Sequence, residues 1–496
     1  MPWQIHLPSF VSAQAEIFLA IWILCLTLVG LFAGRHAFRA TYIGSIIGIV
    51  ITFLLTLKVS FLLNHTTMAR VTFNGLFISD VFSIYAKIFV ISGVGLILAM
   101  IRSSLIQTEL AFFEYPILTL TSTLAMLLMI SANDLLSLFV ALELMSLSLY
   151  ILIALKRKDL KASEASLKYF ILSALATGIF LYGASWIYGY SGTTNYEVLE
   201  RFLSAHTTER MPYLIMGFML VISGIAFKVS AAPFHMWAPD VYQGTPTPVL
   251  SFLSTVPKFV AFIIVLRLIT GPFHHLMPHA SIIFLILSVG SMLIGAFAAL
   301  TQQSIKRFIA YSSIGQIGFA LIGVYLAVGE GYHVTLLFLV YYLITMIGFM
   351  ACLVHLSRRG HALSTLADLN GLGKHHPIIS FCLGFFVFSL MGIPPMPGFL
   401  PKLMIIQATV HQGHYALSIV AVLYSVIAAA YYLLFIKAIF IDQPLNEHTD
   451  IASLKTSGAE SLIVAYGLVA TLLSLIFYPN PLIAWTSYVA ASLLYF

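Results

Sequence analysis

Isolated charged residues lie in the middle of long apolar stretches of this chain. Glu143 lies in the stretch FVALELMSLSLYIL, and Lys228, Lys258 and Lys402 lie in three later stretches. A charge at the centre of a membrane-spanning helix costs roughly 2.5 to 3.5 kcal/mol on insertion scales, so each of these residues is a candidate functional site. A lysine whose proton affinity is set by a nearby carboxylate can carry a proton. The residues therefore predict that the chain moves charge inside a membrane. The alternative, in which Glu143 and one lysine only form a structural ion pair, stays open.

Prolines lie close to the same lysines. In GIAFKVSAAPFHMWAPD, Pro233 follows Lys228, and in MGIPPMPGFLPKLMI several prolines precede Lys402. Pro257 directly precedes Lys258. Proline removes a helix hydrogen bond, and unpaired backbone at membrane depth is tolerated only where it is buried in protein or lines a hydrated cavity. The sequence therefore predicts interrupted helices with hydrated paths beside these lysines.

The composition indicates an integral membrane protein. Hydrophobic residues make up 60% of the chain and charged residues only 8%, and the mean hydropathy is +1.00. Stretches of about 20 apolar residues predict an all-α membrane protein with about 14 transmembrane helices. They are expected at 15–33, 41–63, 79–101, 116–131, 135–155, 165–188, 212–236, 248–270, 280–300, 306–327, 332–356, 377–411, 415–440 and 460–478. The first stretch is too long for the core of a signal peptide and is expected to be a span.

The basic residues outside these stretches favour one side of the membrane. Loops after odd-numbered spans hold Arg35, Arg39, Arg102, Lys156, Arg157, Lys158, Lys161, Lys306, Arg307, Arg358, Arg359, Lys374 and Lys455, whereas loops after even-numbered spans hold Arg70, Arg201 and Arg210. By the positive-inside rule both termini are expected on the outer side. The net charge of +6 therefore reflects topology, and the expected surroundings are a lipid bilayer rather than nucleic acid.

Other basic residues fall within the spans themselves. Four of them, Lys58, Lys87, Arg267 and Lys437, lie near enough to the ends of their spans that we expect them to reach the headgroups. Lys168 lies in the sixth span.

A short pattern occurs twice and predicts an internal repeat. Gly224 to Lys228 and Gly398 to Lys402 both read Gly-x-x-x-Lys, each in the fourth helix of a group of five. Repeats with an odd number of helices have inverted topology and place ion sites near the midplane. The expected organisation is a three-helix segment at 1–115, two inverted-topology five-helix repeats at 116–270 and 271–440 with discontinuous helices seven and twelve, and a last helix and tail at 441–496.

Nothing in the sequence predicts redox chemistry. Cys25, Cys352 and Cys382 are isolated in apolar spans, without the spacing of an iron–sulfur or zinc site. No glycine-rich phosphate loop follows a strand. No cofactor or metal is therefore expected in this chain.

Several motifs together resemble one family. The runs PFHMWAPDVYQGTPTPV, IKRFIAYSSIGQIG, DLNGLG and GIPPMPGF and the glutamate helix are similar to the N-type antiporter-like subunit of respiratory complex I, the proton-pumping NADH:quinone oxidoreductase. The resemblance covers nearly the whole chain, and the run from Tyr242 to Gly244 favours the N type over the M and L types. It implies a subunit of the bacterial inner membrane, with M-, L-, K-, J-, A- and H-type partners. NAD, FMN, iron–sulfur clusters and quinone are expected in partner subunits.

The resemblance also implies roles for single residues. Glu143 matches a glutamate that modulates a lysine, here Lys228, while Lys258 matches a connecting lysine and Lys402 a terminal lysine. Lys168 matches a lysine of lesser weight.

His235 could join the hydrated path, although a lone histidine near a helix break is more often a structural hydrogen bonder. Three positions depart from the family pattern: Gln316 stands where many relatives have histidine, and Pro257 and Pro401 stand where serine and glycine are common.

Two other readings stay open. The chain resembles subunits of related cation/proton antiporters and membrane-bound hydrogenases as well, because these share the fold. It could also be a structural scaffold whose charges only hold helices together.

Overall fold

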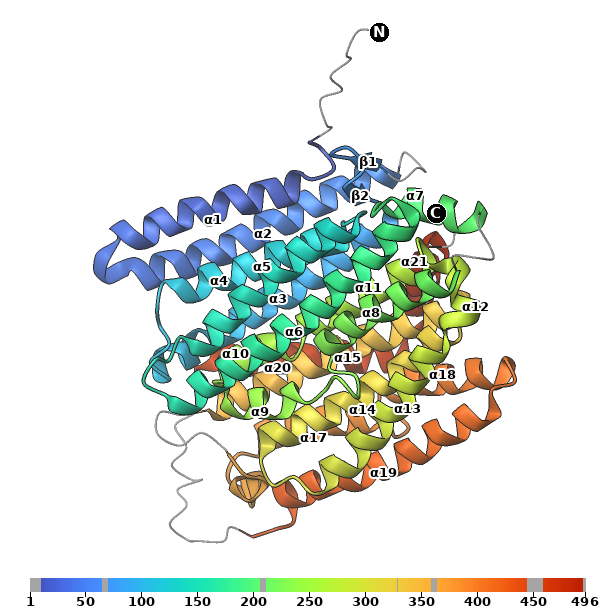
Figure 1. The fold of residues 1–496 in the computed structure, drawn as a ribbon. Helices are drawn as coiled ribbons and strands as arrows, with labels where there is room; N and C mark the ends of the chain where they lie inside the picture. The colour runs from blue at the N-terminus through green and yellow to red at the C-terminus, as the bar shows by residue number, and fades with distance from the viewer. Residues whose placement is uncertain are drawn as a thin grey trace.

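The computed structural model describes residues 10–64, 70–205, 211–327, 329–357, 364–443 and 458–493, and these are nearly all helical (Figure 1). Two short strands, β1 (Arg70–Thr72) and β2 (Phe77–Ser79), form an antiparallel hairpin in which Val71 pairs with Ile78. The hairpin marks one end of the helix bundle, called the hairpin end below. The carbonyl of Gly75 in its turn accepts hydrogen bonds from the side chains of Asn133 and Asn195, which fix the hairpin to the bundle.

The first part of the chain forms α1 (Gln14–Phe32), the short η1 (Gly34–His36), α2 (Ala37–Asn64) and α3 (Val81–Gln107). Next come α4 (Glu114–Ile130), α5 (Leu135–Ala154), α6 (Leu160–Ser191), the short α7 (Tyr196–Ala205) and α8 (Met211–Val229). The chain continues with α9 (Trp237–Gly244), α10 (Thr247–Leu253) and α11 (Val256–Thr270). The carboxylates of Asp80, Asp134 and Asp159 accept backbone hydrogen bonds at the starts of α3, α5 and α6, so each of these helices begins at a capping aspartate.

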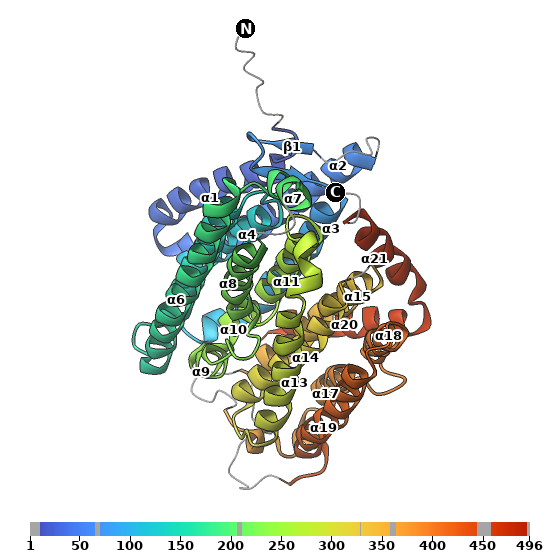
Figure 2. The same cartoon turned by 45° about the vertical axis from the view of Figure 1, so that its right-hand side comes forward.

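The second part begins with η2 (His274–Leu276) and α12 (Met277–Ala280), followed by α13 (Ile282–Leu300), α14 (Ile305–Tyr325) and α15 (Gly329–Leu356). After η3 (Leu366–Leu369) and α16 (Leu372–His375) come α17 (Pro377–Met391), α18 (Phe399–His411) and α19 (Tyr415–Phe440). The chain ends in α20 (Ala459–Phe477) and α21 (Asn480–Ser492). Figure 2 shows α1 and α2 on one side of the molecule and α17 and α19 on the other, with α11, α14 and α15 between them.

The protein is a multi-pass membrane protein. Twelve helices of the described residues are long and apolar enough to cross a bilayer, and Glu114–Ile130 and Pro377–Met391 are shorter apolar helices. The segment Thr247–Thr270 is wholly buried within the protein, whereas only a third of α1, α19 and α20 is. The core therefore lies around α10 and α11. The predicted number of about 14 spans and the inverted repeats stay predictions.

The motif DLNGLG lies in the connection before α17. The Asp368 carboxylate accepts hydrogen bonds from the backbone amides of Ser364 and Thr365 at 2.8 and 2.9 Å. Burial by itself would raise the pKa of Asp368, but these hydrogen bonds hold that pKa below its ordinary value. Gly371 has a φ of +78°, which glycine adopts without strain. The motif thus shapes this connection.

The prediction that four basic residues reach the headgroups is wrong for two of them. Lys87 is 3% exposed and its Nζ lies 2.5 Å from Glu16 Oε1, and Arg267 is 3% exposed with Nη2 2.8 Å from Asp80 Oδ1. Each cation is buried because a carboxylate from another part of the chain neutralises it. Lys58 and Lys437 are exposed, as expected for such residues. Of the residues that predicted the orientation, Arg210, Arg358, Arg359 and Lys455 lie outside the described residues.

Candidate functional site

Lys228 lies at the point where α8 ends. Its side chain is 6% exposed, and Nζ donates hydrogen bonds to the hydroxyl of Ser146 on α5, at 2.7 Å, and to that of Ser173 on α6. The carbonyl of Phe227, in the last turn of α8, accepts a hydrogen bond of 2.7 Å from Trp237 Nε1 at the start of α9 and one of 3.0 Å from the backbone amide of Ser230. The end of α8 is therefore closed by a tryptophan, and its lysine is held by neutral hydroxyl groups.

Glu143 lies on α5, one helical turn before Ser146. The structure has no salt bridge between Glu143 and a described lysine, although the carboxylate interacts electrostatically with Lys228. Glu143 is half-buried, and its Oε1 is buried without a hydrogen bond from the described residues. The structural ion pair considered above is thus not formed.

Two weaker candidates lie apart from the buried lysines. Lys168 on α6 is 45% exposed, and its Nζ lies 2.8 Å from Glu164 and 3.1 Å from Asp240. His235 is half-buried in the connection between α8 and α9. In the described part of the chain, neither residue forms a hydrogen bond or ion pair with Glu143 or with the three buried lysines.

Lys258 lies in the first turn of α11, in the wholly buried segment. It is 2% exposed, its Nζ donates a hydrogen bond of 2.7 Å to Ser313 on α14, and it lies 5.0 Å from the ring centre of Tyr242. The preceding Pro257 is within the first turn of α11, where a missing N–H costs no helix hydrogen bond. Ser254 and Thr255 separate α10 from α11 directly before this turn, so the helix expected at 248–270 is not continuous beside Lys258.

Lys402 closes the end of another helix. Its Nζ donates to the carbonyls of Leu390 and Met391 in the last turn of α17, at 2.8 and 3.0 Å, and the side chain is 4% exposed. A cation is favourable at this end of a helix. Pro401 lies in the first turn of α18 and, like Pro257, removes no helix hydrogen bond there.

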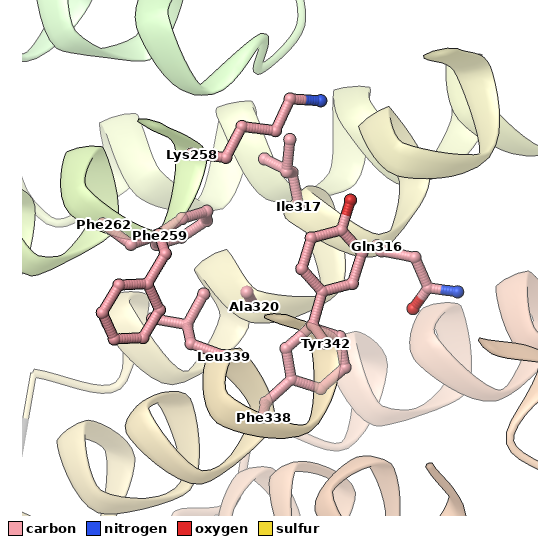
Figure 3. A pocket seen from close by; sticks show the side chains of 9 residues that line it. All are labelled: Lys258, Phe259, Phe262, Gln316, Ile317, Ala320, Phe338, Leu339 and Tyr342. Carbon is pink, nitrogen blue, oxygen red and sulfur yellow. The ribbon is translucent and has the colours of Figure 1, made fainter. Parts of the chain in front are cut away.

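Two small cavities lie between Lys258 and Lys402. Lys258 lines the first, whose side chains Figure 3 shows, and Lys402 lines the second. Gln316, Phe338 and Tyr342 line both. Each has room for about one water molecule. The two cavities therefore lie on either side of a shared wall that contains Gln316, Phe338 and Tyr342.

Gln316, which lines both cavities, is held in place by two hydrogen bonds. Its Nε2 donates to the Leu390 carbonyl at 2.8 Å, which is also bound by Lys402, and to the Tyr432 hydroxyl at 3.2 Å. The amide thus occupies the position where a histidine was expected from the resemblance. It can donate and accept hydrogen bonds but does not titrate.

The serine hydroxyl groups that accept hydrogen bonds from the lysines were not predicted from the sequence. Ser146, Ser173 and Ser313 were not singled out, although each lies in an apolar helix. A serine within a predicted span was the available signal, but many such serines only bond to the preceding turn of their own helix. For metals, no group of three or more His, Cys, Asp or Glu side chains is close enough to hold an ion in the described ranges.

Comparison with known proteins identifies similar chains. The family model described as NADH:quinone oxidoreductase/Mrp antiporter, TM, matches residues 132–428. NADH-quinone oxidoreductase subunit N of Rhodospirillum rubrum is 41% identical over 433 residues, covering 87% of this chain and 88% of that protein. The subunit N of Granulibacter bethesdensis is 38% identical over 492 residues, covering 98% and 100%.

Two solved structures are also similar. A chain of respiratory complex I from Thermus thermophilus superposes with a TM-score of 0.78 at 28% identity, covering 95% of this chain and 98% of that one. A chain of the Mrp complex from Dietzia sp. superposes with a TM-score of 0.85 at 21% identity, covering 98% of both. The second likeness concerns the fold alone.

Proposed function

The chain belongs to the subunit N family of NADH-quinone oxidoreductase, and we propose that it carries protons through the membrane arm of such a complex. Electrons pass from NADH to quinone in partner subunits, which hold the NAD, FMN, iron–sulfur and quinone sites. Its neighbours are membrane-arm subunits of the M, L, K, J, A and H types. The complex lies in a bacterial cell membrane, and both termini of this chain lie on the outer side.

The observation that carries the proposal is a difference between two sets of buried cations. Lys228, Lys258 and Lys402 are bound to hydroxyl or carbonyl oxygens, with no carboxylate within 4.0 Å among the described residues. Two other buried cations of the described chain are each paired with a carboxylate. A purely structural charge is stabilised by a fixed partner. Lysines that bind only neutral groups can lose and regain a proton without leaving a counter-charge unpaired.

The first half of the route runs from Lys228 to Lys258. Lys228 takes up a proton from the cytoplasmic side, and the through-space interaction with Glu143 favours its charged form. When this interaction weakens, the proton passes to Lys258 through water beside Tyr242, whose ring lies under the Lys258 amine.

The second half runs from Lys258 to Lys402. The two cavities that share Gln316 and Tyr342 hold the waters of this step. Lys402 then releases the proton to the outer side. Conformational changes in neighbouring subunits drive the cycle through coupled charges.

The helices that bear the first and last lysines are the predicted discontinuous helices. α8 ends at Val229 and α9 begins at Trp237, while α17 ends at Met391 and α18 begins at Phe399. Under the proposal these two interruptions occupy corresponding places in two inverted repeats and admit water to the midplane.

Substitution of Lys402 tests the carrier role. Arginine keeps the positive charge but releases no proton in the accessible pH range, and methionine removes the charge at similar bulk. We expect both Lys402→Arg and Lys402→Met to abolish proton pumping by an assembled complex in proteoliposomes. Lys437→Arg, on the exposed face of α19, is the matched control and should pump normally.

The scaffold alternative makes the opposite prediction. A scaffold tolerates Lys402→Arg, and Lys402→Met even stabilises it. Subunit content and NADH oxidation are measured beside pumping, so that failed assembly is recognised. Normal pumping by an assembled Lys402→Arg complex refutes the carrier role.

The role of Glu143 has its own test. Glu143→Ala removes the charge that acts on Lys228, so we expect a complex of unchanged subunit content to pump more slowly and to turn over less quinone. Glu164→Ala, which removes an exposed carboxylate from α6, is the control. Equal pumping by the two variants contradicts the modulating role.

One measurement separates a complex I subunit from a subunit of a related antiporter or membrane-bound hydrogenase. The Mrp complex chain shares the fold at 21% identity, which leaves the coupled reaction open. A subunit inventory of the purified complex decides it, because only complex I contains the NADH-oxidising and quinone-reducing modules.

A further inference from the structure

A wall of three side chains separates the cavity at Lys258 from the cavity at Lys402. Gln316, Phe338 and Tyr342 are the described residues that line both cavities. Each cavity has room for about one water molecule. A proton on the direct route from Lys258 to Lys402 therefore has to cross this wall.

Two of the three wall residues are poorly suited to pass a proton. Phe338 carries no polar atom. The Gln316 amide uses both of its N–H groups in hydrogen bonds to the Leu390 carbonyl and the Tyr432 hydroxyl, and an amide does not titrate. A tyrosine hydroxyl, by contrast, donates one hydrogen bond and accepts another at the same oxygen. Tyr342 is therefore the wall residue that can take a proton on one side and give one up on the other.

The Tyr342 hydroxyl has its hydrogen-bonding capacity unused. Its oxygen is buried and forms no hydrogen bond with a described residue. In Figure 3 it points towards the side of the cavity on which the Lys258 amine lies. Ser313 interacts with this hydroxyl and accepts the hydrogen bond of 2.7 Å from Lys258 Nζ. Because buried hydroxyl groups normally have partners, we expect the waters of the two cavities to be the partners of Tyr342.

Two neighbouring tyrosines have similar hydroxyl groups but different positions. The hydroxyls of Tyr242 and Tyr341 are also buried without a hydrogen bond from the described residues. The Tyr242 ring lies 5.0 Å from Lys258 Nζ, but Tyr242 lines neither of the two cavities, and Tyr341 lines only the one at Lys402. Of these three hydroxyl-bearing residues, Tyr342 alone borders both spaces.

We infer that the Tyr342 hydroxyl passes the proton from the cavity at Lys258 to the cavity at Lys402. The inference rests on the proposed function and adds a residue to its second half. Lys258 gives a proton to the water in the first cavity, and that water gives one to the Tyr342 oxygen. The original hydroxyl proton leaves for the water in the second cavity, which gives a proton to Lys402. At Tyr342 one O–H bond forms and one breaks, so the phenol is neutral afterwards, and rotation about its C–O bond restores the starting orientation.

Tyr342→Phe tests this role because it removes the hydroxyl and keeps the ring. Proton uptake and NADH oxidation are measured together in proteoliposomes of the intact complex, with Lys402→Met as the reference for loss of the route. We expect Tyr342→Phe to assemble and to lose as much pumping as Lys402→Met, on the order of 100-fold for the step that the hydroxyl serves. Tyr332→Phe is the matched control and should pump normally. Its hydroxyl, also on α15, is buried and unbonded among the described residues but lines neither cavity.

Tyr342→Ala separates proton transfer from packing. Alanine removes the ring as well and leaves a space that can admit water between the two cavities. If the hydroxyl passes protons, an assembled Tyr342→Ala complex should pump better than the Tyr342→Phe complex. A residue that only packs the wall gives the opposite order, because alanine leaves the larger void.

Three results overturn the inference while Lys402→Met stays defective, so that the proposed function stands. They are wild-type pumping by Tyr342→Phe, an equal loss in Tyr332→Phe, and weaker pumping by an assembled Tyr342→Ala complex than by the Tyr342→Phe complex. If the alanine variant does not assemble, the two phenylalanine variants decide the question. Normal pumping by Lys402→Met instead removes the proposed function itself.

Discussion

Gln316 is the point at which the proposed route is most easily interrupted without loss of a charge. Gln316→Leu replaces the amide by an apolar group of similar size. The Leu390 carbonyl keeps its hydrogen bond from Lys402, and the Tyr432 hydroxyl keeps its contact with Ser312, 3.1 Å away. Because both groups retain a partner, we expect the variant complex to assemble normally.

The effect on proton transfer follows from the hydrogen bonds that are lost. Both N–H groups of Gln316 donate to the protein, so its Oε1 is the group left to accept a hydrogen bond from a water in the cavities that it lines. A water that passes between the cavities in the variant loses this one partner, worth about 1 kcal/mol net. A barrier raised by about 1 kcal/mol slows a step roughly 5-fold. We therefore expect pumping through this subunit to fall by about that factor if the step limits the rate.

Proton uptake by proteoliposomes, measured with a pH-sensitive dye during NADH oxidation, is the assay. Ser312→Ala is the matched control, because it removes a contact with the same Tyr432 but does not line either cavity. Gln316→His should pump normally, since imidazole donates and accepts hydrogen bonds. The reasoning is refuted if Gln316→Leu pumps at the wild-type rate, or if Ser312→Ala is equally impaired.

Two further predictions concern other parts of the chain. Asp80→Ala removes the carboxylate that pairs with the buried Arg267 and should destabilise the folded subunit by about 3–5 kcal/mol. Asp80→Ala/Arg267→Met should recover much of this in thermal inactivation, and no recovery contradicts the pairing argument. Gly392→Ala places a Cβ 2.7 Å from Lys402 Cδ at a φ of +76° and should impair pumping, whereas Gly413→Ala, at a φ of +77° with nothing within 4 Å, suffers the backbone strain alone. Equal pumping by the two glycine variants shows that the Lys402 contact is unimportant.

The helices and the candidate lysines could be predicted because their signals are local. A span is visible as a run of apolar residues, and α5, α13 and α19 begin and end within a few residues of the predicted bounds. Lys228 and Lys402 stand out because a charge within such a run is rare. Prolines next to them indicated where α8 and α17 end, since proline disrupts helix hydrogen bonds wherever it lies.

The partners of these residues were not predictable in the same way. Lys87 was expected to reach the headgroups, but Glu16 on another helix binds it within the protein. Pro257 cast doubt on the geometry around Lys258, and only the structure places the proline in the first turn of α11, just after the break at Ser254 and Thr255. In each case the partner of the residue depends on which helices are neighbours in the bundle. The spacing of apolar residues says little about these neighbours, because the core helices are apolar on all sides.

The sequence by itself determined that the chain spans a membrane many times and that Glu143, Lys228, Lys258 and Lys402 are its unusual charges, because the type of a charged residue and its position within an apolar run are both read from the sequence. Only the tertiary structure decided that these lysines bind neutral oxygens, that Glu143 forms no salt bridge with the described lysines, and that Gln316 lines two cavities. Hydrogen bonds and ion pairs form over about 3 to 4 Å. They are therefore set by the packing of helices that are far apart in the chain.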